Sequence, residues 1–323
     1  MTAMVEISHL TKRFGSITAV DDVSFQVHKG EVLGFLGPNG AGKSTTMRMI
    51  TGFLSPDDGS VIIGGDDLAR DPVAAKKRIG YLPEGAPLYG DMTPATFLDF
   101  VADIRTLKGA AKQQRIADII ATVNLGTVLH QPIETLSKGF KRRLGLAQAI
   151  VHDPEVLVLD EPTDGLDPNQ KHEVRALIRS MAEDKAIILS THILEEVDAV
   201  CTRAMIIARG KVVADGAPAE LEARSQLHNA VILELRGAQA AAAHSVLQTL
   251  PNVTAVAILE QQPDRVLYRL FPKPGVSLVT AVGEAARTHR WDVTELHVER
   301  GRLDDVFRAI TTGSSRLAEE ISP

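Results

Sequence analysis

Cysteine is nearly absent from this sequence, since Cys201 is the only one in 323 residues. A single cysteine excludes a disulfide within the chain and fits a protein of the reducing cytoplasm. No apolar run approaches the ~18–20 residues that a membrane-spanning helix needs, and the N-terminus lacks the apolar core of a secretory signal. We therefore expect a soluble chain that reaches a membrane only through a partner.

The sequence also has little positive charge. With 35 Lys and Arg against 41 Asp and Glu, the formal net charge is −6, which argues against a protein whose main task is to hold nucleic acid. A hydrophobic content of 44% and a charged content of 24% are ordinary for globular proteins. The length of 323 residues favours two domains over one.

One glycine-rich stretch organises the rest of the sequence. It matches the phosphate-binding pattern G-x-x-x-x-G-K-[ST], and it lies between an apolar run of strand type at 31–36 and the first turns of a helix at 46–50. This context makes a chance match rare, so we predict nucleotide binding. The stretch consists of Gly37, Pro38, Asn39, Gly40, Ala41, Gly42, Lys43, Ser44 and Thr45.

The residue types in this loop suit a polyphosphate. Gly40 and Gly42 let the backbone N–H groups approach the phosphates, because no Cβ stands in the way. The start of the following helix adds unpaired N–H donors and the positive end of its dipole. We expect Lys43 to reach the β- and γ-phosphates, and the Ser44 hydroxyl to bind Mg²⁺.

Two adjacent acids follow a second buried strand, at 156–159. Asp160 is predicted to hold Mg²⁺ opposite Ser44, and Glu161 to face the γ-phosphate and polarise the attacking water. His192 ends the next apolar strand, at the edge of a parallel sheet where ligands bind. In isolation, such acids mark an ordinary turn and a lone histidine is more often structural. Beside a phosphate loop, we interpret all three as site residues.

The pattern of elements predicts an α/β first domain at 1–222. Residues 4–29 alternate like an antiparallel β layer, and continuous apolar runs indicate buried parallel strands. Thr93 followed by Pro94 marks a helix start. The region of about 90–152 is helical between strand-rich flanks, so we interpret it as an inserted helical subdomain.

A second domain is predicted at 227–312. Its elements follow the order βαββαβ, typical of a small ferredoxin-like α+β domain, and end in a helix at 302–310. We find no catalytic constellation in it and interpret it as a docking or dimerisation module. The tail at 313–323 is predicted to be frayed.

Together these motifs resemble the ATP-binding cassette (ABC) ATPases over about residues 4–220. The resemblance makes 37–45 the Walker A motif and 156–160 the Walker B motif, followed by the catalytic Glu161. It makes His192 the switch histidine. The implied fold is a P-loop cassette with a mixed sheet core, an antiparallel β layer and a helical subdomain.

The resemblance assigns two further residues. Asp167 ends the D-loop, and Phe14 falls on the aromatic that stacks the adenine base. From its own surroundings, at the end of a strand, Phe14 is better interpreted as a core aromatic, and the resemblance reverses this interpretation.

The sequence departs from the family pattern at two places. The signature Leu-Ser-Gly-Gly-Gln reads Leu-Ser-Lys-Gly-Phe, so the expected contacts to a partner's ATP fall on Ser137, Lys138, Gly139 and Phe140. Glu84 replaces the Q-loop glutamine, which in the family binds Mg²⁺ and lies near the membrane subunit; a side chain pointing to solvent is the alternative. These departures and the extra C-terminal domain resemble the gliding-motility-associated branch, whose subunits pair with membrane proteins of the ABC-2 export type.

The resemblance implies an ATPase with Mg²⁺ as cofactor. Its signature would close on ATP held by a second copy, which implies a homodimer with two ATPs between the chains. Closure and release would drive separate polytopic membrane subunits between two access states. The chain would then lie at the cytoplasmic face of the cell membrane, with no nucleic acid partner.

Three alternatives are weighed against this interpretation. A soluble ABC ATPase of translation or DNA repair usually carries two cassettes or a long coiled-coil insertion, and neither is present. A GTPase should show Asn/Thr-Lys-x-Asp downstream of the phosphate loop, and the sequence has none. Glu161 argues against a nucleotide-binding module without catalysis.

Overall fold

The computed structural model describes residues 3–85, 87–225, 227–237 and 240–312. The chain divides into two compact units, Met1–Ala217 and Pro218–Pro323. The segment predicted to be frayed, 313–323, lies outside the described residues. Among the described residues, no helix has the length and apolar character needed to cross a membrane.

The first unit is built around a central sheet with the strand order β10-β9-β3-β8-β7-β6. The pairs β3–β8, β3–β9, β7–β8 and β6–β7 are parallel, and only β9–β10 is antiparallel. The parallel strands therefore direct their carboxyl ends to one edge of the sheet. The strands are β3 (Val32–Leu36), β6 (Ile79–Leu82), β7 (Val156–Asp160), β8 (Ala186–Thr191), β9 (Arg203–Ala208) and β10 (Lys211–Gly216).

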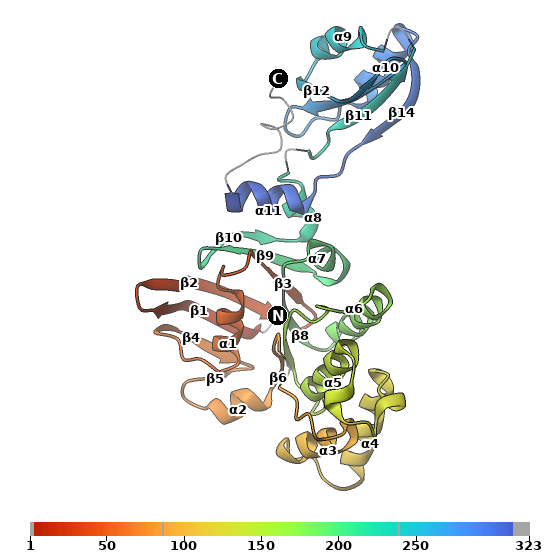
Figure 1. Ribbon diagram of the computed structural model, residues 1–323. Helices are drawn as coiled ribbons and strands as arrows, with labels where there is room; N and C mark the ends of the chain where they lie inside the picture. The colour runs from red at the N-terminus through yellow and green to blue at the C-terminus, as the bar shows by residue number, and fades with distance from the viewer. Residues whose placement is uncertain (1–2, 86, 226, 238–239, 313–323) are drawn as a thin grey trace. The chain divides into compact units, whose positions relative to one another are not determined.

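A second, antiparallel sheet has the strand order β2-β1-β4-β5 (Figure 1). Buried apolar residues of this sheet and of the central sheet form one core. Helix α1 (Lys43–Ile50) follows the phosphate loop and buries Met47, Met49 and Ile50 between the two sheets. This is the mixed sheet and β layer that the sequence predicts. The strands are β1 (Ala3–Phe14), β2 (Ile17–His28), β4 (Asp58–Ile63) and β5 (Asp66–Asp67), and α2 (Pro72–Lys77) follows them.

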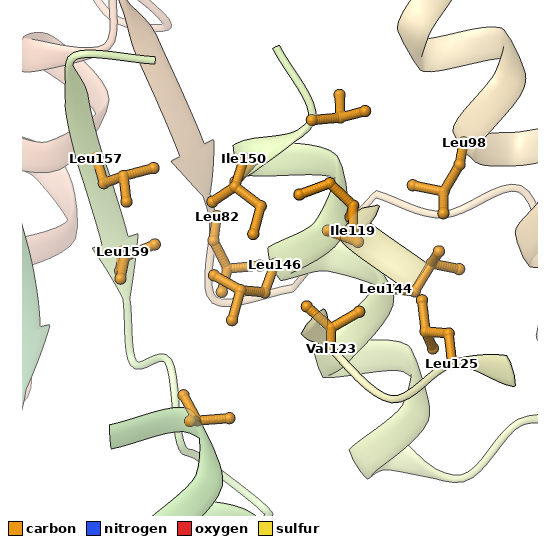
Figure 2. Packing of buried hydrophobic residues seen from close by; sticks show 14 of the residues in the cluster. Leu82, Leu98, Ile119, Val123, Leu125, Leu144, Leu146, Ile150, Leu157 and Leu159 are labelled. Atoms are coloured by element: carbon orange, nitrogen blue, oxygen red, sulfur yellow. The ribbon is translucent and has the colours of Figure 1, made fainter. Parts of the chain in front are cut away.

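The helical subdomain comprises α3 (Pro94–Ile104), α4 (Gly109–Thr122) and α5 (Lys138–Ile150), with short 3-10 turns at Gly126–Val128 and Ile133–Thr135. Helix α5 packs both on the sheet and on the other helices. Figure 2 shows Leu146 and Ile150 on the side of the strands and Leu144 on the side of α3. A single apolar core thus joins the subdomain to the sheet edge at β6 and β7.

Helix boundaries follow from local capping. Thr93 accepts a hydrogen bond from the backbone N–H of Thr96, and Pro94 occupies the first turn, as the sequence predicts. Helix α5 begins at Lys138, because the Ser137 side chain caps the N–H of Phe140. After β7 come α6 (Pro168–Ala182) and α7 (Leu194–Val200).

The second unit contains a sheet with the order β12-β13-β11-β14, in which all neighbours are antiparallel. Its elements follow the predicted order βαββαβ, and this strand order is the ferredoxin-like arrangement. Apolar residues of α9 and α10 pack on one face of the sheet. The elements are β11 (Val231–Arg236), α9 (Ala243–Thr249), β12 (Val253–Gln262), β13 (Arg265–Pro272), α10 (Val279–Thr288) and β14 (Asp292–Val298).

Two further helices bracket the second unit. Helix α8 (Pro218–Glu222) packs against α11 (Leu303–Thr312) and therefore belongs to the second unit. The contact is close, because a Cβ on Gly301 would lie 2.0 Å from the carbonyl oxygen of Glu222. The Ser225 hydroxyl also donates to Asp305, at 3.4 Å.

Candidate active site

The loop between β3 and α1 needs glycine at two positions. A Cβ on Gly42 would lie 2.4 Å from the carbonyl oxygen of Ala19, and the φ of Gly42 is 110°. A Cβ on Gly37 would lie 2.6 Å from the carbonyl oxygen of Ile207. The tight packing of this loop against neighbouring backbone, with α1 starting directly after it, forms a cradle of N–H groups.

Lys43, the first residue of α1, folds back over the loop. Its ammonium donates to the carbonyl oxygens of Gly37 at 2.7 Å and Pro38 at 3.3 Å, and the residue is only 7% exposed. Burial lowers the pKa of Lys43, while the carboxylates of Glu161, Asp160 and Glu84 oppose this effect. The three acids therefore create a negative field at the ammonium, and a phosphate would add to it.

Ser44 and Asp160 lie side by side, although they are far apart in the sequence. The Ser44 hydroxyl donates to Oδ1 of Asp160 at 3.4 Å, and Asp160 is 2% exposed. Ser190, near the end of β8, donates to the same carboxylate oxygen. This donor set of hydroxyl and carboxylate oxygens fits a hard cation such as Mg²⁺. Within the described residues, no three His, Cys, Asp or Glu side chains cluster as a metal site.

Glu161 and His192 meet at the same edge of the sheet. Nδ1 of His192 lies 2.9 Å from Oε1 of Glu161. Glu161 has a φ of 50°, in the left-handed region, and its N–H donates to the carbonyl oxygen of Ser190. The Glu161 carboxylate is nearly buried and the imidazole is half exposed. The pair therefore places a carboxylate beside a partly exposed imidazole at this edge of the sheet.

Phe14 ends β1 and is 50% exposed, so it does not belong to the core. The ammonium of Lys12 lies 5.8 Å from the centroid of its ring, and Asp57 holds this ammonium at 2.8 Å. An exposed aromatic ring of this kind can stack on a flat aromatic ligand.

Glu84 follows β6 in an exposed turn. Its carbonyl oxygen accepts a hydrogen bond from Arg142 at 2.9 Å, and its carboxylate contributes to the negative field at Lys43. Within the described residues, no hydrogen bond joins the Glu84 carboxylate to Ser44 or Asp160.

The signature residues form the start of α5. Ser137 is its N-cap, and a Cβ on Gly139 would lie 2.5 Å from the side chain of Gln170, so this position needs glycine. Lys138 is exposed and Phe140 is partly buried. Asp167 caps α6, because its carboxylate accepts from the N–H of Gln170 at 2.9 Å.

Sequence reasoning missed Ser190 and Arg142. Ser190 carried a usable signal, because it is a polar residue near the end of an otherwise apolar strand. Arg142 carried none, since basic residues are common on amphipathic helices. In the structure, its buried guanidinium contacts the segments that hold Glu84 and Glu161.

Comparisons with known proteins give consistent results. A family model described as ABC transporter matches residues 20–164. The Nod factor export ATP-binding protein I of Paraburkholderia xenovorans is 34% identical over 315 residues, which cover 96% of this chain and 97% of the relative. The linearmycin resistance ATP-binding protein LnrL of Bacillus subtilis is 31% identical, over 95% of this chain and 98% of the relative.

A match of 38% identity to the probable multidrug ABC transporter ATP-binding protein YbhF of Escherichia coli covers 69% of this chain but only 38% of that protein's length. Among solved structures, an ATP-binding subunit of an ABC transporter aligns with a TM-score of 0.64 and 30% identity, over 68% of this chain. The dimeric cassette MJ0796, at 20% identity and a TM-score of 0.62, has the same fold.

Proposed function

This chain belongs to the ABC transporter family of ATP-binding proteins, and we propose that it is the ATP-hydrolysing subunit of an ABC-2-type exporter. The observation that carries the proposal is the meeting of Lys43, Ser44, Asp160, Glu161 and His192 at one edge of the central sheet. Relatives named for Nod factor export and for drug resistance support the export direction.

The geometry supports a separate role for each site residue in hydrolysis. Glu161 accepts a proton from the attacking water, and His192 orients both the carboxylate and the γ-phosphate. Lys43 exchanges the carbonyl oxygens of Gly37 and Pro38 for β- and γ-phosphate oxygens. Ser44 and Asp160 would hold Mg²⁺, which when bound neutralises charge on the β- and γ-phosphates.

The site is proposed to be completed by a second copy of the chain. The N-terminus of α5 presents Ser137 and unpaired N–H groups, which suit a γ-phosphate. Gly139 lets the backbone approach closely. We propose that these donors, with Lys138 and Phe140, contact ATP on the partner, while Asp167 holds the neighbouring turn.

A groove in the first unit is the proposed dock for a membrane subunit. It has a volume of about 860 Å³ and lies between the segment after α1 and helix α3. Its rim exposes Phe53 (74%), Ile104 (62%) and Tyr89 (55%), beside the basic residues Lys76 and Lys77. An apolar cytoplasmic segment with acidic residues fits this surface. The chain would then work at the cytoplasmic face of the membrane.

Finer assignment to the gliding-motility-associated branch is also a proposal. It rests on the Lys-Gly-Phe signature at 138–140, on Glu84, and on the ferredoxin-like second unit. The branch name does not imply motility. The second unit is proposed to serve docking or dimerisation.

The substitution Glu161→Gln tests the hydrolytic role. It keeps the shape of the side chain but removes its charge, so hydrolysis should fall to a slow residual rate while ATP still binds. Size-exclusion chromatography with Mg-ATP should then reveal a trapped dimer. Hydrolysis at the wild-type rate would refute the assignment of Glu161. Co-purification with a polytopic membrane protein separates the exporter from the alternative, a soluble regulatory or repair ATPase.

A further inference from the structure

The guanidinium of Arg142, in the second turn of α5, uses all of its donors on backbone oxygens. A guanidinium has five N–H groups, and each has one carbonyl acceptor here. Nε donates to Pro162 at 3.2 Å, and one terminal nitrogen donates to Pro83 and Glu84 at 2.9 Å each. The other donates to Asp160 and Glu161.

These acceptors belong to two separate segments of the chain. Pro83 and Glu84 follow β6, whereas residues 160–162 end and follow β7. Arg142 is 7% exposed, so its contacts are largely shielded from water. One side chain on the signature helix therefore holds the loop of Glu84 and the segment of the catalytic acid together.

The contact with Glu161 bears on its backbone. The φ of Glu161 is 50°, a conformation that residues with a Cβ rarely adopt. Three hydrogen bonds hold the backbone of Glu161. Its N–H donates to the carbonyl oxygen of Ser190, and its carbonyl oxygen accepts from Arg142 and from the N–H of Asp164. The left-handed turn in turn aims the carboxylate at His192, 2.9 Å away.

We infer that Arg142 is a positioning residue for hydrolysis, which holds Glu161 in its left-handed turn and ties that turn to the Glu84 loop. The inference rests on the proposed role of Glu161 as the base. Because Arg142 lies five residues after Ser137 on the same helix, a movement of the signature changes the hydrogen bonds of both loops together. Arg142 thus couples the approach of a second copy to the orientation of the Glu161 carboxylate.

A merely structural role is the rival explanation. Buried carbonyl oxygens need donors wherever they occur, and Arg142 would then stabilise the unit without any specific effect on Glu161. The two roles differ in what happens to catalysis once Glu161 has been neutralised, so the test is built on that difference.

The experiment uses the full chain with Arg142→Met, which keeps the apolar stem and removes every donor, and Arg142→Lys, which keeps the charge. We expect kcat of Mg-ATP hydrolysis to fall about 100-fold in Arg142→Met, the scale of a displaced general base, with partial recovery in Arg142→Lys. The dissociation constant of a fluorescent ATP analogue should change less than about threefold, a shift small beside the effect on kcat.

Arg115→Met is the matched control. Arg115 also donates to backbone oxygens of α5, those of Ile150 and Val151 at the opposite end of the helix. Its loss should leave kcat close to the wild-type value. If Arg142→Met does not fold, Arg142→Lys alone carries the comparison.

The decisive measurement combines Arg142→Met, or Arg142→Lys, with Glu161→Gln in single-turnover hydrolysis. If Arg142 acts through Glu161, it adds no further loss in that background. A full additional loss, an unchanged kcat in the single variant, or equal losses of ATP binding and kcat would each overturn the inference. Failure of the proposed function would look different. In that case the wild-type chain would not hydrolyse Mg-ATP, or Glu161→Gln alone would hydrolyse it at the wild-type rate.

Discussion

Nδ1 of His192 lies 2.9 Å from Oε1 of Glu161, and the two residues directly follow different strands of one sheet. The imidazole is 52% exposed while the carboxylate is 11% exposed, so the histidine faces the substrate side. We predict that His192→Ala lowers kcat about 100-fold with little change in ATP affinity. Steady-state hydrolysis and equilibrium binding measure both, with His130→Ala at an exposed site as control. A wild-type kcat would contradict this role.

Phe14 is proposed to stack its exposed ring on the adenine base. Stacking a base on an aromatic side chain is worth ~1–3 kcal/mol, so Phe14→Ala should weaken ATP binding about 5- to 150-fold. The ring is half exposed, so its loss should not unfold the unit. Fluorescence titration measures the affinity, and Val213→Ala, another exposed apolar position in the first unit, should leave it unchanged. Equal affinities for wild type and Phe14→Ala would exclude stacking.

Glu84 should make ATP affinity depend steeply on free Mg²⁺. A carboxylate is a better ligand for a hard cation than an amide oxygen, and without the metal its charge opposes the γ-phosphate. Its influence on the pKa of Lys43 places this charge within electrostatic range of the loop. Glu84→Gln should flatten the Mg²⁺ dependence while hydrolysis continues. The measurement is a titration of ATP affinity against Mg²⁺ for each variant, with Glu183→Gln as control. Identical curves for the wild type and Glu84→Gln would mean that Glu84 does not reach the metal.

The second unit is expected to leave the ATP site intact when it is removed. Every residue proposed to bind ATP lies before the boundary at Ala217. A chain truncated after Ala217 should bind ATP within about twofold of the full chain, although dimerisation or coupling can weaken. Equilibrium binding on the folded, monodisperse truncation measures this. Loss of binding in such a sample would show that the second unit contributes to the site.

His152, just after α5, makes the first unit sensitive to acid. Burial lowers the pKa of His152 from 6.5 to about 4, helped by the charge of Arg105. Its Nε2 lies 3.0 Å from the carbonyl oxygen of Ile79. Because the folded pKa is depressed, the unfolded chain binds more protons between pH 6.5 and 4, so the stability contribution is lost as the pH falls through this window.

The variant His152→Gln keeps a donor for Ile79 but cannot titrate. Its melting temperature should therefore fall less steeply than that of the wild type between pH 7 and pH 4. Thermal unfolding followed by circular dichroism at several pH values measures the slopes. Parallel slopes would show that His152 does not titrate in this window.

Short sequence patterns predict those parts of the fold that are determined by residues close together in the sequence. The phosphate loop was predictable because glycine is needed where the backbone of residues 37–42 packs closely, and because Lys43 and Ser44 follow at a fixed spacing. The order βαββαβ was predictable because alternation and helical periodicity are local signals.

Contacts between distant segments were not predictable in the same way. Arg142 is separated by 59 residues from Pro83, and nothing in the sequence around either residue indicates that they meet. Ser190 reaches Asp160 only because β7 and β8 are parallel neighbours in register. The roles of these two residues follow from the sheet order and the position of α5, and both are properties of the tertiary fold.

The packing of α8 against α11 places the first helix of the second unit beside its last described helix. Gly301 lies close to Glu222 at this contact. Any larger residue at 301 would clash with the backbone of Glu222 and separate the two helices. A protein engineer could therefore excise the unit, or graft it into a surface loop of another protein, through a pair of adjacent splice points.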